Sequence, residues 1–490
     1  MRKGVLRSVM NRKIGAAAIS AAALAMVFSG CGKSEHGLNP DHPVTITVWH
    51  YYNGVQQQAF DRMITEFNET VGSEKGIVVQ AFSQGSVNEL LTKVTDAANE
   101  KLGSEDMPDI FGAYADTAYE LNQLGRVADI GQYLTKEEQD EYVDAYMREG
   151  AFDGEDSRKM FPIAKSTEIL MLNKTDWDAF SAGTGASEDK LQTWEGIAEL
   201  AEMYYKWTDA QTPEPEDGKA FFGRDEMANY ILIGSKQMGH EVFQVKDGQV
   251  TYNLDKETMR RLWDCYYIPY INGYFAAEGR FRSDDMKTGD IIAMACSSTG
   301  ATYFPLEVTR NDGTTYPIEG AVYALPNFAG TEPCAVQQGA GMVVAKSTEE
   351  REYASVVFLK WFTDVEQNAQ FATNSGYLPV KKAANQIPVL DEALDASGQN
   401  SSSLMKDSLH IGVEMTNRYE LYTNQAFRQG TQARNVIKAS MQDWAARDAQ
   451  AVQDAVAGGA SREAAAEKFD TDENFEAWLA ELQGLLNDLK

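Results

Sequence analysis

The sequence contains few cysteines and few histidines. Four cysteines occur in 490 residues and none shows CxxC spacing, so the pattern predicts neither a disulfide framework nor a zinc site. The cysteines beyond the N-terminal segment are Cys265, Cys296 and Cys334. Three thiols cannot all pair. His50, His240 and His410 lie far apart in sequence, which argues against a metal-binding function.

Positive charge is also scarce. The chain has 73 acidic and 44 basic residues and a formal net charge of -29, a field that repels nucleic acid and anionic lipid headgroups. It has no GxSxG motif or comparable nucleophile motif, and beyond residue 28 no segment approaches membrane-spanning length. By contrast, the contents of 43% hydrophobic and 10% aromatic residues are those of an ordinary globular chain, long enough for two to four domains.

The N-terminus has the layout of an export signal. Basic residues up to Lys13 precede an apolar run over residues 14–28 that is too short for a comfortable membrane span. Small residues then precede Cys31, an arrangement that resembles the bacterial lipoprotein signal and implies lipidation of Cys31. The alternative is an ordinary signal peptide with a nearby cysteine. We predict a signal peptide over residues 1–30 and a flexible tether over residues 31–43, which is polar and rich in helix breakers.

The first third of the chain alternates strand and helix patterns. Residues 44–49 and 77–82 are predicted strands, each followed by a helical pattern, and a third strand ends near residue 113. This order predicts a parallel sheet, and ligands of such sheets bind outside the carboxyl ends of the strands. The polar and aromatic residues at these three ends are His50, Tyr51, Gln84, Tyr114 and Asp116. They are therefore candidate ligand-binding residues.

Residues 161–175 have the pattern of a strand that passes from one lobe to another. The run over residues 169–172 is apolar and short, as expected of a buried strand, but residues 165–168 are all polar or charged. Burial of such groups without partners would cost about 1 to 3 kcal/mol each, so we expect the middle of this strand to face a wet cleft. Ser166 and Glu168 would point the same way. The alternative is an edge strand with a solvated centre.

The second half of the chain repeats these features. An apolar strand over residues 291–296 ends in hydroxyl residues, among them Ser298 and Thr299, which suit a polar ligand and would serve equally well as helix caps. Residues 321–325 form a second candidate crossing strand, and Gln338 follows it. The remainder, from residue 386, has a mostly helical pattern.

Four stretches together resemble a known family: residues 45–50, 161–174, 287–294 and 339–379. In this order and spacing they are similar to the extracellular solute-binding proteins of ABC importers, in particular the large carbohydrate-binding family that includes maltose-binding protein. The resemblance implies an α/β fold of two lobes, with a hinge and a cleft between them. Lobe 1 would comprise residues 44–163 and 326–395, and lobe 2 residues 164–325 and 396–490.

The resemblance also implies a function and a set of ligand contacts. The expected protein is a lipid-anchored, monomeric, non-enzymatic receptor on the outer face of the bacterial membrane, without cofactor or metal, that captures a sugar by hinge closure and delivers it to an ABC permease. The family's cleft positions fall at His50, Tyr51, Gln84, Tyr114, Asp116, Ser166, Glu168, Tyr230, Ser298, Thr299, Gln338 and Phe427. Gly300 stands where sugar binders of the family often have tryptophan, so Tyr303 is a substitute candidate for stacking on the sugar ring.

Other ligands and activities stay open at this point. Asp116 and Glu168 could act as acid and base of a surface glycoside hydrolase. A sugar phosphate or an amino acid or peptide usually requires arginine, and none stands among the candidates. If Glu168 binds ligand in a hinge, its replacement by Ala should weaken binding and leave the fold intact.

Overall fold

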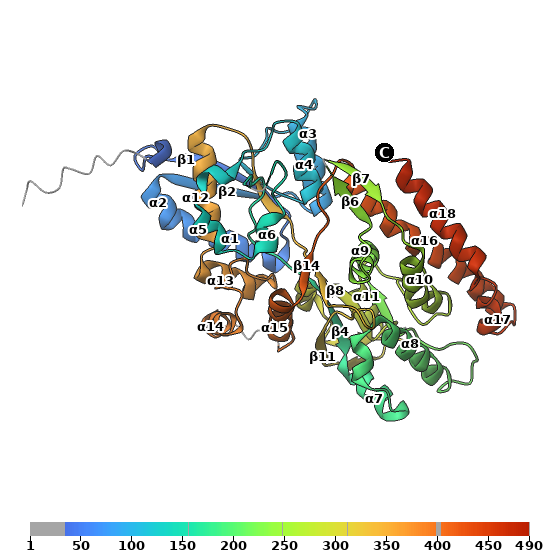
Figure 1. The fold of residues 1–490 in the computed structure, drawn as a ribbon. Helices are drawn as coiled ribbons and strands as arrows, with labels where there is room; N and C mark the ends of the chain where they lie inside the picture. Colours follow the sequence, from blue (N-terminus) through green and yellow to red (C-terminus); the bar gives the residue numbers. More distant parts are fainter. Residues whose placement is uncertain (1–34, 155, 247, 311, 398–402, 490) are drawn as a thin grey trace, which may run out of the picture.

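The computed structural model describes residues 35–489 except 155, 247, 311 and 398–402 (Figure 1). The predicted signal peptide and the predicted lipidation site Cys31 lie outside these residues. Within the described ranges, no helix has the length and apolar character needed to cross a membrane.

The first sheet has four strands in the order β13-β3-β1-β2 and defines lobe 1. The strands are β1 (Val44–His50), β2 (Ile77–Ser83), β3 (Ile110–Ala113) and β13 (Gly341–Val344). As predicted, β1 runs parallel to β2 and β3, whereas β13 returns from far along the chain and pairs antiparallel with β3. The carboxyl ends of β1, β2 and β3 therefore meet at one edge of the sheet.

Helices cover both faces of this sheet. They are α1 (Gly54–Glu69), α2 (Val71–Lys75), α3 (Val87–Ala98), α4 (Ala115–Gln123), α5 (Lys136–Asp140), α6 (Asp144–Arg148), α12 (Glu349–Phe362) and α13 (Val365–Ser375). Phe60 of α1 and Phe362 of α12 are fully buried on one face, and Leu90 of α3 packs with Phe111 on the other. A capping box formed by Ser86 and Glu89 fixes the start of α3 at the edge where the strands end.

The second sheet defines lobe 2 and has the order β11-β4-β8-β5. Its strands are β4 (Glu168–Asn173), β5 (Phe222–Arg224), β8 (Ala293–Ser297) and β11 (Gly320–Ala324). The central strand β4 is buried along its whole length, as its apolar run predicted, and pairs antiparallel with β8 and β11. The candidate crossing strand over residues 321–325 is thus mostly β11, within the lobe 2 sheet, and the crossing follows it.

Helices of two parts of the chain surround lobe 2. They are α7 (Lys174–Thr184), α8 (Trp194–Asp209), α9 (Met227–Gln237), α10 (Lys256–Ile271), α11 (Arg282–Thr288), and the C-terminal α16 (Gly430–Ala457), α17 (Arg462–Ala466) and α18 (Asp472–Asn487). Figure 1 shows α16 and α18 beside α10 at the outer side of this lobe. Trp263 of α10 and Trp478 of α18 are fully buried and pack on each other, with ring centroids 5.2 Å apart.

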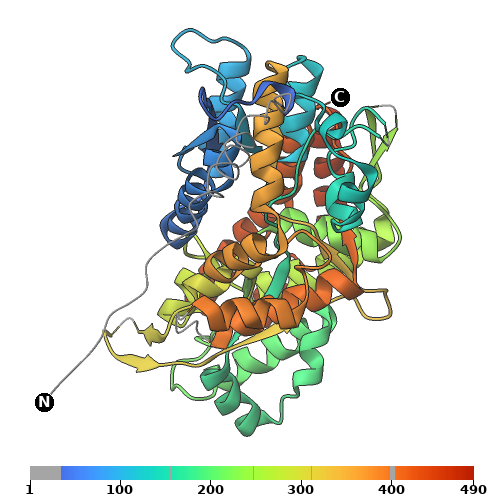
Figure 2. The same cartoon turned by 90° about the vertical axis from the view of Figure 1, so that its left-hand side faces the viewer.

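Smaller elements complete the structure. They are the hairpins β6 (Phe243–Lys246) with β7 (Gln249–Tyr252) and β9 (Glu307–Thr309) with β10 (Thr315–Pro317), the helices α14 (Ile387–Ser397) and α15 (Ser403–Arg418), and four 3-10 turns at Glu35–Gly37, Ile130–Tyr133, Glu188–Gln192 and Ser298–Tyr303. In Figure 2, α13 and α15 lie across the waist of the molecule, between the blue part of lobe 1 and the green part of lobe 2. Cys265, Cys296 and Cys334 are free and buried.

Two of the segments that carry the chain between the lobes lie side by side. Residues 161–168 lead from lobe 1 into β4, and residues 325–340 lead back through β12 (Cys334–Val336). Backbone hydrogen bonds join them at Ser166 and Gln338. β12 also pairs in parallel with β14 (Glu420–Tyr422), which leads toward α16.

The polar middle of the first crossing differs from the sequence-based expectation. Lys165, Thr167 and Glu168 are at most 2% exposed instead of facing a wet cleft. The ionised groups tolerate burial because each has an opposite charge beside it: Glu149 contacts Lys165, and Arg224 contacts Glu168. Sequence shows that such residues need partners, but tertiary structure decides whether protein or solvent supplies them.

Candidate functional site

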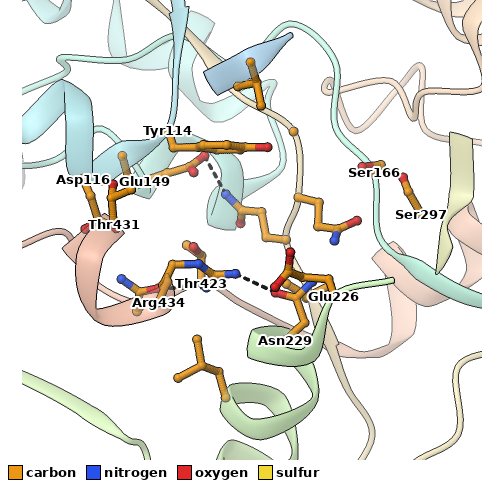
Figure 3. Close-up of a pocket in the computed structure, with 18 of the residues that line it drawn as sticks. Tyr114, Asp116, Glu149, Ser166, Glu226, Asn229, Ser297, Thr423, Thr431 and Arg434 are labelled. Atoms are coloured by element: carbon orange, nitrogen blue, oxygen red, sulfur yellow. Dashed lines mark hydrogen bonds between the residues drawn. The ribbon is translucent and has the colours of Figure 1, made fainter. Parts of the chain in front are cut away.

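A cavity of about 430 Å³, lined by both polar and apolar residues, lies between the two lobes and the crossing segments. Its walls come from α3, α4 and Glu149 in lobe 1, from α9 and α16 on the lobe 2 side, and from residues 336–339 and Ser166 of the crossings. Figure 3 shows Tyr114, Asp116 and Glu149 on one side of this space and Arg434, Glu226 and Asn229 across it. The carboxyl edge of the lobe 1 sheet thus forms part of the wall.

Three tyrosines of lobe 1 line the cavity: Tyr51, Tyr114 and Tyr377. Tyr114 precedes α4 and is 42% exposed, so a face of its ring is available to a bound molecule. Tyr51 follows β1, and its hydroxyl accepts a hydrogen bond from the backbone N–H of Ala340 at 3.4 Å. A flat apolar ring beside polar groups suits a ligand that combines an apolar face with hydroxyl groups.

Asp116 lies in the first turn of α4 and faces the start of α16. One carboxylate oxygen, Oδ1, accepts a hydrogen bond from the backbone N–H of Phe427 at 3.2 Å. Burial raises the pKa of Asp116 to about 6, and this hydrogen bond and the charge of Arg434 oppose the rise. Gly430 permits the close approach, because a Cβ atom there would collide with the Asp116 carboxylate.

Glu149 reaches the cavity from the end of α6, with a side chain only 8% exposed. Its Oε2 atom accepts hydrogen bonds from Lys165 Nζ and, at 2.9 Å, from Gln337 Nε2. Lys165 Nζ also donates to the carbonyl oxygen of Gly339 at 2.8 Å. The carboxylate is therefore held by both crossing segments.

The lobe 2 wall presents charged and amide groups from two helices. Arg434 Nη2 donates to Asn229 Oδ1 at 2.8 Å, and Lys438 Nζ donates to Glu226 Oε2 at 3.0 Å. Residues four apart on a helix share a face, so α16 brings Arg434 and Lys438 to the wall together. Within the described ranges, Lys438 has a carboxylate partner and Arg434 has none within salt-bridge distance.

Five of the predicted ligand residues line this cavity. They are Tyr51, Tyr114, Asp116, Ser166 and Gln338. Tyr51, Tyr114 and Asp116 were predicted from their positions at the ends of strands, and Ser166 and Gln338 from their positions in or near the crossing segments. Their contact with ligand stays a prediction, but the fold brings them into one space.

Four other predicted residues belong to the packed interior. His50 is fully buried, with its ring centroid 4.8 Å from that of Phe60, and burial lowers its pKa to about 4. Gln84 accepts a hydrogen bond from Lys93 Nζ at 2.7 Å. Tyr230 and Phe427 do not line the cavity: the Tyr230 hydroxyl donates to the carbonyl of Leu262 at 2.9 Å, and the Phe427 ring packs on Phe243.

At the end of β8, the cavity is lined by Ser297 instead of the predicted residues Ser298 and Thr299. Ser298 is fully buried and its backbone N–H donates to the carbonyl of Thr167 at 2.8 Å, whereas its neighbour Ser297 lines the cavity. Thr299 donates to Ser297 Oγ at 3.1 Å and is not on the wall. Tyr303 is 57% exposed at the end of the following 3-10 turn, also away from the cavity.

Glu168 is sealed inside lobe 2. Its Oε2 atom accepts a hydrogen bond from Arg224 Nη2 at 3.0 Å, and the Arg224 guanidinium lies over the rings of Trp194 and Tyr230 at 5.2 and 4.9 Å. Burial raises the pKa of Glu168, and the charge of Arg224 opposes this. Glu168 therefore has an internal partner where the sequence analysis assigned a ligand.

Sequence reasoning missed several residues of the wall. They include Glu149, Glu226, Asn229, Ser297, Arg434 and Lys438. The spacing of Arg434 and Lys438 on one helix face was a usable signal, whereas Glu149 ends a five-residue helix and no local pattern marks it. No group of three or more potential metal ligands occurs in the described part of the chain.

The fold and the interlobe cavity define the class of two-lobed binding proteins, which confirms the predicted α/β architecture. The sequence pattern of the bacterial extracellular solute-binding proteins matches residues 62–397, and the chain belongs to this family. The class is that of the substrate-binding components of ABC importers, as predicted. No curated protein matches the sequence.

Solved structures with the same fold cover nearly the whole chain. UgpB from Mycobacterium tuberculosis, in complex with glycerophosphocholine, has a TM-score of 0.65 at 18% identity and covers 91% of this chain and 99% of its own. The cyclic alpha-maltosyl-1,6-maltose binding protein from Arthrobacter globiformis has 0.61 at 20% identity, covering 91% and 100%. The maltose/maltodextrin-binding domain MalE from Bdellovibrio bacteriovorus, bound to maltotriose, has 0.58 at 15%, covering 89% and 99%.

Proposed function

We propose that this protein captures a sugar or oligosaccharide between its lobes, outside the bacterial cell, and delivers it to a membrane permease. The observation that carries the proposal is the composition of the interlobe cavity. An exposed tyrosine face, Tyr114, stands opposite polar groups that include Asn229 and Arg434. Aromatic faces cover the C–H face of a sugar ring, and carboxylates and amides bind its hydroxyl groups.

Capture follows from contacts that exist only in the closed form. A ligand in this cavity touches both lobes at once, and only such differential contact can shift the population toward closure. The proposal includes a monomeric receptor held at the outer face of the membrane through lipid on Cys31. Two or more acyl chains on one residue anchor stably where one does not.

The carboxylate pair that the sequence suggested for hydrolysis does not come together in the cavity. A glycosidase needs an acid and a base that flank the scissile bond. Of the two candidates from the sequence, Asp116 lines the cavity but Glu168 is sealed by Arg224.

Arg434 favours a second ligand class, a phosphate ester. In the described part of the chain its guanidinium has only amide partners, Asn229 and Asn424, so its charge is available to an anion. Against this class, the cavity wall has three carboxylates, Asp116, Glu149 and Glu226, and only two cations. We therefore place a neutral sugar first.

A thermal-shift screen of the soluble chain from residue 32 onward tests the proposal. The panel contains mono- and oligosaccharides, sugar phosphates, glycerophosphocholine, amino acids and divalent metals. A ligand that binds only the native state stabilises it by about 2.7 kcal/mol at a hundredfold excess over its Kd. We expect a neutral sugar to stabilise the protein and to be recovered unchanged. Stabilisation by phosphate esters alone would select the second class, and a consumed sugar would indicate a hydrolase.

A further inference from the structure

Glu149 presents one carboxylate oxygen to the cavity while the other is fixed. Oε2 receives both hydrogen bonds, from Lys165 Nζ and Gln337 Nε2. In the described part of the chain, Oε1 has no hydrogen-bond partner, although Glu149 lines the cavity. Figure 3 shows the Glu149 carboxylate on the same side of the cavity as Tyr114. A polar atom of this kind is available to a ligand without loss of an existing bond.

The fixed oxygen connects Glu149 to both crossing segments, residues 161–168 and 325–340. Lys165 belongs to the first crossing and Gln337 to the second. Lys165 also exchanges backbone hydrogen bonds with Leu378, at 3.1 and 2.6 Å, and its side chain is fully buried. The orientation of the Glu149 carboxylate is thus set by the crossings themselves.

A carboxylate held in this way recognises one kind of ligand group. It can only accept hydrogen bonds, so it binds a hydroxyl or ammonium group and repels a carboxylate or phosphate at the same place. Because two donors already hold it, little further ordering of the side chain is needed when ligand binds. The adjacent Tyr114 ring then restricts the hydroxyl donor to one that projects from a ring covering that face.

We propose that Glu149 is a specificity-determining ligand contact, which accepts a hydrogen bond from a ring hydroxyl of the bound sugar. Lys165 and Gln337 are its positioning residues. These two residues hydrogen-bond the Glu149 carboxylate to both crossing segments. Binding of the hydroxyl to this carboxylate therefore favours the closed arrangement of the lobes. The inference rests on the proposed function and names the chemistry of one subsite.

The test separates ligand contact from structural support. Glu149→Gln alone would leave the buried Lys165 ammonium without an opposite charge and would destabilise the fold. The variant used is therefore the double substitution Glu149→Gln with Lys165→Met, which removes both charges and keeps side-chain length. The matched control is the double substitution Glu138→Gln with Lys360→Met, which removes an ion pair of lobe 1 that lies outside the cavity wall.

The readout is the Kd for the sugar found in the screen and for its deoxy analogues, each lacking one hydroxyl, by calorimetry. We expect the double variant to keep a cooperative thermal transition and to bind the sugar roughly 10- to 100-fold more weakly, the range for loss of a hydrogen bond to a charged group. Wild type should discriminate against one deoxy analogue by a similar factor, and the double variant should not. The control variant Glu138→Gln with Lys360→Met should keep both the affinity and that discrimination.

Two results would overturn the inference in distinguishable ways. If wild type binds a sugar and the double variant keeps both the affinity and the discrimination, Glu149 is not a contact and the proposed function stands. If wild type binds no sugar in the panel, the proposed function and the inference both fail.

Discussion

The first crossing segment carries two buried ion pairs that have opposite relations to the cavity. Lys165 pairs with Glu149, whose carboxylate lines the cavity, whereas Glu168, three residues further on, pairs with Arg224 beneath Trp194. The first pair joins lobe 1 to the crossings, and the second lies within lobe 2. The difference teaches that a buried charged residue in a crossing segment requires a partner of opposite charge. Whether the ion pair is accessible to a ligand depends on where that partner lies.

The largest effect is expected from breaking the sealed pair. Glu168→Ala leaves the Arg224 charge buried and unpaired, so the free energy of unfolding should fall by about 3 to 5 kcal/mol in urea titrations. The double variant Glu168→Leu with Arg224→Met should recover most of this loss. This reverses the expectation from sequence that Glu168→Ala leaves the fold intact, and unchanged stability would show that the pair is dispensable.

A pH titration sharpens the comparison through Asp116, a cavity carboxylate that forms no salt bridge within the described ranges. The folded state raises its pKa from 3.8 to about 6, so folded protein retains the proton where unfolded protein has lost it. Stability from this group is fully present below pH 4 and is lost as pH rises to about 6, a loss of about 3 kcal/mol.

Asp116→Asn removes this titration. Measured by urea unfolding, the free energy of unfolding of the variant relative to wild type should increase by about 3 kcal/mol between pH 4 and pH 7. A difference that does not change with pH would show that Asp116 keeps its ordinary pKa. Arg434, Glu120 and Glu149 all act on this carboxylate, so the shape of the curve reports their combined charge.

The aromatic wall should contribute less. Tyr114→Ala should weaken sugar binding about tenfold, or about 1 to 2 kcal/mol, through loss of the ring face. Tyr114→Phe keeps the face and should bind within a factor of about two of wild type. Equal weakening in both variants would assign the effect to the hydroxyl instead of the ring.

The smallest effect is expected at Tyr303, which the sequence suggested as a stacking residue. Since it is 57% exposed and away from the cavity, Tyr303→Ala should change the free energies of binding and unfolding by less than about 0.5 kcal/mol. Calorimetry on Tyr303→Ala beside Tyr114→Ala gives the direct contrast. A tenfold loss at Tyr303 would extend the binding surface beyond the cavity described here.

Local pattern predicted the fold better than the site. Strand and helix periods gave the lobe 1 sheet and the buried strand β4, because each depends on residues near in sequence. The argument from strand ends located Tyr51 and Asp116 correctly on the cavity wall but also selected His50. Side chains alternate along β1, and the face to which His50 belongs is the core.

The remaining errors have two physical causes. After β8 the chain turns into a 3-10 helix, so the direction of Ser297 and Ser298 depends on that turn rather than on strand alternation. Glu149 reaches the cavity only because distant segments converge there, and no pattern in its neighbouring residues indicates this. Burial of Glu168 likewise depends on Arg224, 56 positions further along.

The chain segment that follows β14 has a consequence for how the ligand selectivity of this protein can diversify. The family pattern ends at residue 397, but Thr423, Asn424, Thr431, Arg434 and Lys438 of the cavity wall all follow it. On the proposed function, part of the surface that contacts the ligand therefore lies in a stretch of chain different from the crossing segments at residues 161–168 and 325–340. On that proposal, we expect substitutions at the cavity-lining positions among residues 423–438 to alter selectivity and to leave the side chains of the two crossing segments unchanged.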